Sequence, residues 1–303
     1  MTFTTKLKEE ISKLEHNSIE SRSIIDAFLR YNALIDKKIT ITLENAAVTR
    51  FIYKLIKVTF DIAPKVTVRV QKRFRVKQIY ILEINEKIDY IKKTLNIKDL
   101  PLIDSDEEKI AFLKGAFLGV GNVSNPKTSG YHLEFILNDK NDAIYITSIL
   151  NYFNLNAKVI KRGYKYLSYI KMSESISDLI KMFKAINSLF EFEDIRIYRD
   201  HKNMVNRLNN CEIANQEKTI KNGMNQIEDI KYLEENDLIS LMDEKMQIVI
   251  EYRKKYPESS YQELAEIISM ETDYKVGKSG INHHFRNLRK IKENHLNSLK
   301  KVG

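Results

Sequence analysis

Residues 111–123 read AFLKGAFLGVGNV, and residues 24–35 carry a second version of the same pattern, IIDAFLRYNALI. Both segments are apolar with helical spacing, and both end in small or turn-forming residues. Ala27 and Gly115 hold equivalent places in the two segments, 88 positions apart. Self-similarity at a long period indicates an internal repeat, so we expect two copies of one structural unit.

The segments that follow each apolar helix also match. Alternating residues 38–43 (KITITL) and 131–137 (YHLEFIL) predict strands. Each strand is followed by a helix that opens with Asn or Asp, which suit the N-cap. A hairpin and a closing helix complete each half, and Arg162-Gly163 marks the second hairpin turn. The predicted order is αβαββα, twice, with the later elements at 44–60, 65–84 and 85–97, and again at 138–153, 157–172 and 175–186.

We expect the two halves to pack through their apolar helices. Small residues on both helices permit close approach, namely Ala27, Ala33, Gly115, Ala116 and Gly119. Each half would then contribute a four-stranded sheet to one shared saddle. Side chains alternate along a strand, so Val66, Val68 and Val70 should point one way and Lys65, Thr67 and Arg69 the other.

Both predicted hairpins are basic. They form a secondary basic surface made of Lys65, Arg69, Arg73, Arg75, Lys77, Lys161, Arg162 and Lys165, with Tyr164, Tyr166 and Tyr169 interleaved in the second hairpin. One interpretation is a partly aromatic surface for nucleic acid. The other is an ordinary solvated sheet face whose lysines prevent edge-to-edge aggregation. The sequence leaves both open.

A stronger concentration of charge lies at the C-terminal end. Residues 275–301 contain eight Lys or Arg and one acid, in a chain whose net charge is +9. Two helices are expected before this segment, at 240–256 and 259–270, and Ser260 and Glu263 have capping-box spacing. The connector from 271 to 277 is longer than a minimal helix-turn-helix requires. The charge and the helices together predict an all-α DNA-binding module.

The last helix divides into two faces. Ile281, Phe285, Leu288 and Ile291 form one apolar stripe, so the polar residues between them are displayed. A recognition helix in the major groove reads base edges with such side chains. Ser279 is the expected N-cap, and it would hold phosphate together with Lys278. The predicted DNA-binding residues are Lys278, Ser279, Asn282, His283, Arg286, Asn287, Arg289 and Lys290.

Composition excludes several other classes of protein. No apolar run reaches the roughly 18–20 residues that span a bilayer, and the first residues lack a secretory core. Cys211 is the sole cysteine, which we expect to be buried and inert. Adjacent His283 and His284 point about 100° apart and suit no shared metal. We therefore expect a cytoplasmic, nucleoid-associated protein without metal, cofactor or membrane partner.

The two-helix repeat resembles the LAGLIDADG homing-endonuclease fold. In active members an acid at the end of each motif helix holds a divalent metal. Aligned on AFLRYNA and GAFLGVG, those positions fall here on Asn32 and Val120. Val120 offers no oxygen ligand to a hard cation. The resemblance therefore implies a scaffold that has lost its nuclease anchors, and no catalytic residue is assigned.

The chain as a whole resembles the WhiA family of bacterial DNA-binding regulators. The resemblance rests on FLKGAFLGVGNVSNPKTSGYHLEF (112–135), FEFEDIRIYRDHKNMVNRLNNCEIANQEKTI (190–220) and GKSGINHHFRNLRKI (277–291). It implies a degenerate LAGLIDADG domain followed by a helix-turn-helix domain, no enzyme activity, and a regulatory or chromosome-associated role in cell division, with sporulation in spore-forming relatives. Double-stranded DNA is the implied partner, with transcription or division proteins as further candidates.

The resulting fold class is α+β: a pseudo-symmetric two-repeat LAGLIDADG-like αβαββα domain, followed by an all-α helix-turn-helix domain. The predicted segments are 1–97 and 98–190 for the two halves, 191–215 for a linker and 216–303 for the C-terminal domain. The polar linker either contacts phosphate or is a hydrogen-bonded connector that packs against both domains. An alternative function is a DNA-tethered interaction protein whose saddle binds a protein or small ligand.

Overall fold

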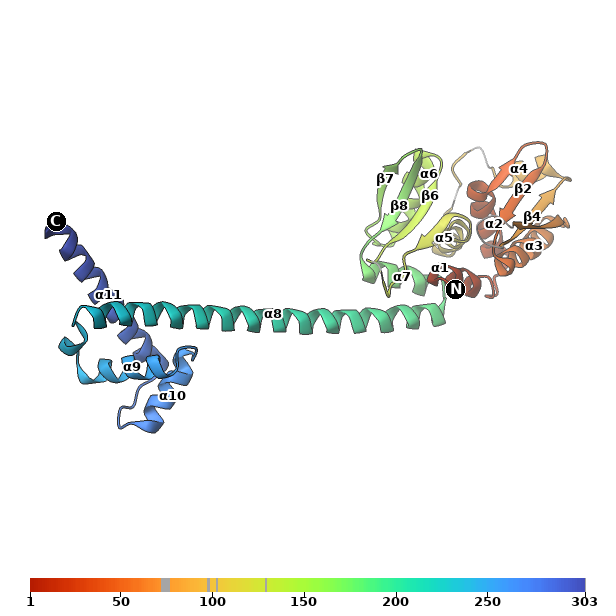
Figure 1. Cartoon of the computed structure of the whole chain (residues 1–303). Helices are drawn as coiled ribbons and strands as arrows, with labels where there is room; N and C mark the ends of the chain where they lie inside the picture. Colours follow the sequence, from red (N-terminus) through yellow and green to blue (C-terminus); the bar gives the residue numbers. More distant parts are fainter. Residues whose placement is uncertain (72–76, 97–98, 102, 129, 303) are drawn as a thin grey trace. The chain divides into compact units, whose positions relative to one another are not determined.

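A computed structural model describes residues 1–303 apart from 72–76, 97–98, 102, 129 and 303; the side chains of 77, 241 and 300–302 also lie outside the description. The chain divides into two compact units, Met1–Asp200 and His201–Gly303. The long helix α8 (Ile186–Glu235) belongs to both, since it is continuous across the boundary (Figure 1).

The first unit contains the predicted repeat. Its first half consists of α2 (Ser18–Asn32), β1 (Ala33–Ile35), β2 (Ile39–Leu43), α3 (Ala46–Phe60), β3 (Lys65–Gln71), β4 (Lys77–Ile84) and α4 (Ile88–Thr94). Its second half consists of α5 (Asp106–Val120), β5 (Gly121–Val123), β6 (Leu133–Leu137), α6 (Lys140–Tyr152), β7 (Lys158–Arg162), β8 (Lys165–Ile170) and α7 (Ser173–Met182). A short helix α1 (Phe3–Ile11) precedes them.

Each half holds one more strand than the predicted αβαββα order. The three-residue strands β1 and β5 follow the motif helices directly and complete two antiparallel sheets of identical order, β1-β2-β4-β3 and β5-β6-β8-β7. The repeat and the four-stranded sheets are thus confirmed, and the element order is corrected to αββαββα.

Local sequence explains where these helices begin. The side chains of Asn45 and Asp139 accept hydrogen bonds from backbone N–H groups in the first turns of α3 and α6, as predicted for N-caps. Asn17 and Ser105 each form a full capping box, before α2 and α5 respectively. Equivalent helices of the two halves are therefore initiated by the same kind of contact.

The two motif helices α2 and α5 pack closely at Gly115. A Cβ atom on Gly115 would lie 2.1 Å from the backbone oxygen of Ile24, so only glycine fits there. A Cβ on Gly119 would lie 3.1 Å from the Cβ of Asn32. The small residues of the motif therefore allow the approach that the sequence predicted, and the C-terminal ends of both helices lie side by side.

Helices cover one face of each sheet (Figure 1). In the first sheet, Ile39, Ile41, Leu82 and Ile84 are buried on that face. In the second sheet, Leu133, Phe135 and Ile170 are buried in the same way. The opposite faces carry the intervening residues, because side chains alternate along a strand. These opposite faces are the walls of the expected saddle.

The second unit is built from helices. The C-terminal end of α8 packs with α9 (Glu244–Lys255), α10 (Tyr261–Glu271) and α11 (Lys278–Val302), and a 3-10 turn, η1 (Ile239–Leu241), follows α8. Ser260 and Glu263 form the predicted capping box of α10. The core contains Ile230, Leu264, Ile281, Phe285 and Leu288. The predicted all-α module with its apolar stripe is therefore confirmed.

Candidate nucleic-acid interface

Helix α11 presents the polar face that its sequence predicts. Ile281, Phe285 and Leu288 are buried and Ile291 packs against them, which fixes the rotation of the helix about its axis. The side chains that this rotation displays are Asn282, His283, Arg286, Arg289 and Lys290, all exposed, and Asn287, which is half-buried. Basic and amide side chains on one helical face can contact both phosphates and base edges.

The start of α11 differs from the prediction. The helix begins at Lys278, and the backbone oxygen of Gly277 accepts a hydrogen bond from Ile281 N–H at 3.1 Å. Gly277 therefore occupies the position expected for Ser279, which lies inside the first turn. Ser279 is thus not the N-cap. Lys278 and Ser279 are nevertheless exposed beside the free N–H groups of that turn, where an anion is stabilised.

Three residues on the displayed face already contact neighbours. Asn287 Nδ2 lies 3.0 Å from His283 Nε2, one helical turn away. Arg289 Nε donates to Glu293 Oε1 at 3.3 Å, and both of these side chains are exposed. Within the described residues, Arg286 and Lys290 form no ion pair. Arg286 and Lys290 therefore meet an incoming phosphate without first giving up a carboxylate.

His284 belongs to the support of the helix. Its Nε2 lies 2.8 Å from the hydroxyl of Tyr274, and the ring is half-buried. Burial lowers the pKa of His284, so the imidazole is neutral at pH 7. Tyr274 lies in the connector between α10 and α11. This contact therefore ties the connector to the helix that carries the polar face.

The long connector is further held by Ser269 of α10. Its Oγ donates to the backbone oxygen of Val276 at 3.2 Å and accepts from Val276 N–H at 3.1 Å. Lys275 also donates to the backbone oxygen of Ser269 at 2.5 Å. These bonds fix the loop although it exceeds the usual helix-turn-helix length. The length therefore does not make the polar face of α11 mobile.

Arg253 is a structural residue that the sequence did not reveal. This α9 side chain is 1% exposed, and its Nη1 donates to the backbone oxygens of Tyr256 (3.2 Å), Pro257 (3.3 Å) and Ser259 (2.7 Å). The guanidinium also lies 5.2 Å from the ring centre of Phe285. Burial lowers the pKa of Arg253. Arg253 links the α9–α10 turn to the buried side of α11, and thereby positions the displayed face.

The secondary basic surface is split by the sheet. Lys65 and Arg69 lie on the solvent-facing side of the first sheet, where Lys65 pairs with Glu83 in register. Val66, Val68 and Val70 are on the helix-covered side, as predicted, yet they remain 49–54% exposed because β3 is an edge strand. Arg73 and Arg75 lie outside the described residues, as does the side chain of Lys77.

The second hairpin shows the same division. Arg162 and Lys165 lie on the solvent-facing side of their sheet, since they continue the alternation of Lys158, Ile160, Leu167 and Tyr169. Lys161 lies on the other side, with its Nζ 5.8 Å from the ring centre of Tyr166. Strand alternation therefore removes Lys161 from the predicted basic surface.

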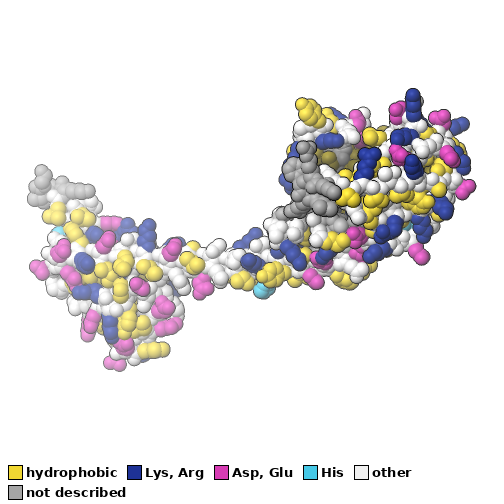
Figure 2. Space-filling model, turned by 45° about the vertical axis from the view of Figure 1, so that its right-hand side comes forward, with side chains coloured by type: hydrophobic (Ala, Val, Ile, Leu, Met, Phe, Trp, Pro, Cys, Tyr) yellow, Lys and Arg dark blue, Asp and Glu magenta, His cyan; other side chains and the backbone are white. Residues whose placement is uncertain are grey.

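Apolar residues interrupt both solvent-facing sheet surfaces. Leu34 is 75% exposed on the first sheet, and Ile136 and Ile160 are exposed on the second. On the face of the Met1–Asp200 unit that Figure 2 shows, Lys and Arg side chains are scattered among apolar ones instead of forming one patch. Among the described residues, the saddle thus carries fewer basic side chains than the hairpin sequences alone suggest.

The degenerate positions Asn32 and Val120 end helices α2 and α5 and lie close together, as the repeat predicted. On β6, which pairs with the strand that follows α5, the buried carboxylate of Glu134 accepts from Asn122 Nδ2 at 3.2 Å and lies 3.0 Å from His132 Nε2. Glu134 is therefore already engaged by two neighbours. In the part of the chain described, no three His, Cys, Asp or Glu side chains gather as a metal site requires.

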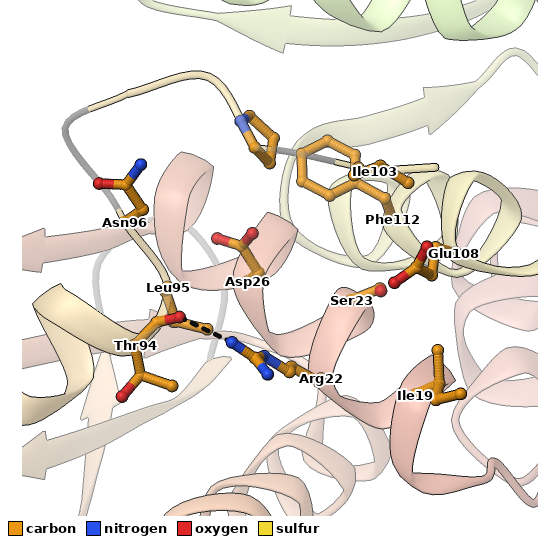
Figure 3. A pocket seen from close by; sticks show the side chains of 11 residues that line it. Ile19, Arg22, Ser23, Asp26, Thr94, Leu95, Asn96, Ile103, Glu108 and Phe112 are labelled. Atoms are coloured by element: carbon orange, nitrogen blue, oxygen red, sulfur yellow. Dashed lines mark hydrogen bonds between the residues drawn. The ribbon is translucent and has the colours of Figure 1, made fainter. Parts of the chain in front are cut away.

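A pocket also lies between the two halves, at α2, the end of α4 and the start of α5 (Figure 3). Arg22 crosses its wall and donates to the backbone oxygen of Thr94 at 3.0 Å. Asp26, whose pKa is raised by burial, and Glu108 place acids in the same lining. Its mixed charge differs from the cationic face of α11, so the pocket is not part of the candidate nucleic-acid interface.

Among the described helices, none is both long and apolar enough to cross a bilayer. Family models match almost the whole chain in order. They are the WhiA N-terminal LAGLIDADG-like domain (residues 20–98), the WhiA LAGLIDADG-like domain (109–202) and the WhiA C-terminal HTH domain (205–292).

Full-length relatives agree with these matches. The chain is 35% identical to a "Probable cell division protein WhiA" of Clostridium botulinum over 96% of this chain and 98% of the relative. It is 36% identical to the protein of that name in Bacillus cereus over 97% and 96%. The crystal structure of full-length DUF199/WhiA from Thermatoga maritima, 24% identical, aligns with a TM-score of 0.57 over 97% of this chain and 99% of that one. The repeat, the helix-turn-helix unit and these similarities together show that the chain belongs to the WhiA family.

Proposed function

We propose that this protein is a DNA-binding transcriptional regulator, or a chromosome-associated protein, that acts in cell division and lacks nuclease activity. The observation that carries the proposal is the displayed face of α11. Buried Ile281, Phe285 and Leu288 orient the helix, so that Asn282, Arg286 and Lys290 project from an unobstructed surface. The cell-division role is taken from the names of the full-length relatives.

The contacts on α11 are assigned by their chemistry. Arg286 and Asn282 are placed to read base edges, since Arg suits guanine and Asn suits adenine in the major groove. Lys278, Ser279 and the first-turn N–H groups are placed to hold phosphate. Lys290 and Arg289 would add salt-dependent affinity. His283 and Asn287 complete the proposed contact surface.

Absence of nuclease activity is proposed from Asn32 and Val120. Two-metal phosphodiester cleavage needs oxygen ligands beside the scissile phosphate, and the helix ends supply one amide and one isopropyl group. Glu134 is an acid on β6, and its hydrogen bonds to Asn122 and His132 hold it in the sheet. Incubating the protein with supercoiled plasmid and Mg²⁺ or Mn²⁺ tests this directly. Site-specific nicking would refute the proposal.

Genome-wide crosslinking of the protein to DNA tests the main proposal. Wild-type protein should give discrete peaks, which the double variant Asn282→Ala/Arg286→Ala should lose. The matched control is Lys254→Ala/Lys255→Ala, which removes two cations that already pair with Glu234 and Glu271. Retention of the peaks in the α11 variant would show that DNA is read elsewhere.

A second candidate function follows from the apolar saddle surface. Exposed Leu34, Ile136 and Ile160 on the solvent-facing sheet sides suit a protein or small ligand better than bare phosphate. In this function α11 tethers the protein to DNA and the saddle recruits a partner. A variant with four charge reversals would distinguish a partner-recruiting saddle from a DNA-binding saddle. The four changed residues are Lys65, Arg69, Arg162 and Lys165, each replaced by Glu. An unchanged DNA affinity favours recruitment, whereas a large loss favours a DNA-binding saddle.

A further inference from the structure

The middle of α8 lacks the packing that normally stabilises a helix. Every residue from 200 to 218 is exposed, around the whole circumference of the helix. The stretch overlaps the segment 191–215, for which a connector packed against both domains was one interpretation. From 200 to 215 the side chains are exposed instead. Most helical stability in proteins comes from burying one face. An exposed helix of this length therefore calls for a partner.

One side of this helix carries an apolar stripe. Phe190, Ile197, Met204 and Leu208 are each 59–65% exposed, and Figure 2 shows apolar side chains along the surface of α8. Phe190, Ile197, Met204 and Cys211 follow one another at seven-residue intervals. Cys211 is exposed, which corrects the expectation that it is buried. A seven-residue apolar repeat is the signature of a helix that packs lengthwise against another helix.

The repeat can be written as a heptad register. Placing Ile197, Met204 and Cys211 at position d puts His201, Leu208 and Asn215 at position a. A single Asn at position a fixes register and favours a two-stranded coiled coil, because two such amides can pair across the seam. Most positions outside a and d are polar, although Tyr198, Val205 and Ile213 are also exposed there. The seven-residue repeat follows one line along the helix, which fits one helical partner.

Charge complementarity identifies the partner as a second copy in parallel orientation. In this register Arg207 occupies position g and Glu212 position e, five residues later. A parallel in-register pair places each g side chain beside the e side chain of the other helix. Arg207 of each copy would thus form an ion pair with Glu212 of the other copy, which gives two equivalent ion pairs in the dimer. Within the described chain, neither side chain forms an ion pair.

We propose that the protein forms a parallel homodimer through α8, with the seam running over residues 197–215. About two and a half heptads form the seam, so the dimer should dissociate on dilution. If α11 binds DNA as proposed above, a dimer presents two copies of that helix to two half-sites. The dimer itself is independent of that function, and it is tested without DNA.

Cys211 offers a direct test because it is the sole cysteine. In the full-length protein, sedimentation should show a monomer–dimer equilibrium, and a short bis-maleimide should link Cys211 to Cys211 of the second copy. Leu208→Glu places a charge in the seam and should abolish both results. The control Asn206→Glu adds the same charge about 160° away around the helix and should leave both unchanged.

Orientation is tested by exchanging the flanking charges. Arg207→Glu should weaken the dimer by about tenfold, since it replaces two attractive contacts with two repulsive ones. The double exchange Arg207→Glu/Glu212→Arg should restore it. A protein that stays monomeric up to about 100 µM overturns the proposal. A dimer that survives Leu208→Glu, or that the double exchange does not restore, overturns it as well.

Discussion

Replacing Arg253 by Met tests how the C-terminal unit holds α11. Methionine keeps much of the buried volume but removes the donors that bind three carbonyl oxygens of the α9–α10 turn. One Nη carries two hydrogens, so the three contacts amount to about two full hydrogen bonds. Each charged bond contributes roughly 1.5–3 kcal/mol, which gives about 3–6 kcal/mol in total.

Removing the buried charge offsets part of that loss. The neutral methionine side chain avoids the desolvation cost of a buried guanidinium, which offsets the loss by about 1–3 kcal/mol. The turn carbonyls can also regain water, because Ser259 is only half-buried. The middle values of these two ranges differ by about 2–3 kcal/mol, which is the loss that we expect in the free energy of unfolding of the C-terminal unit. DNA affinity should fall with it, since Phe285 loses its contact with the guanidinium.

Guanidinium chloride unfolding, followed by circular dichroism, measures the change. The matched control is Lys255→Met on the same helix, which breaks an exposed pair with Glu271 and exposed contacts with the rings of Tyr252 and Tyr256, and should shift the transition far less. An unchanged or raised stability in Arg253→Met would refute the reasoning. Such a result would mean that burying this charge costs more than its hydrogen bonds contribute.

Two further outcomes follow from the first unit and the helix caps. Gly115→Ala should lower the free energy of unfolding by at least about 2 kcal/mol, because its Cβ would lie 2.1 Å from the Ile24 carbonyl oxygen. The control Gly130→Ala places its Cβ in open space and should change little. Equal shifts of the melting temperature in the two variants would contradict this. Hydrogen bonds from Ser105 and Ser260 lower the pKa of Glu108 and Glu263 in the folded protein, so their stabilisation is present above about pH 4.5 and lost as pH falls through the folded pKa. Urea titrations at pH 7 and pH 3.5 should show a smaller acid loss in Glu108→Gln/Glu263→Gln, and an unchanged acid loss would rule this out.

Much of the fold was predictable because its signals are long and periodic. The repeat around Ala27 and Gly115, the capping residues and the stripe from Ile281 to Leu288 all extend over several turns or strands. Strands β1 and β5 were missed because three residues are too few to show alternation. The N-cap of α11 was misplaced by two residues because Gly277 and Ser279 both suit that position.

The features that the sequence could not supply depend on tertiary surroundings. Arg253 reads as one more basic residue of α9, and its burial depends on the turn that folds over it. Cys211 reads as apolar, yet α8 leaves it exposed. Lys161 belongs to a basic run, but the register of β7 with β8 places it beside Tyr166. In each case the sequence gives the residue type but not which element packs against it, and that packing decides its exposure and contacts.

The central claim is that the displayed face of α11 binds duplex DNA. Fluorescence anisotropy of a fragment recovered by crosslinking, measured over a salt series, compares wild type with Arg286→Ala/Arg289→Ala. We expect a loss of more than about 1 kcal/mol for each arginine that reaches a base, or a salt slope reduced by about one for each that binds phosphate. Arg289 should contribute less, because it must first release Glu293. Unchanged affinity and salt slope would contradict the account.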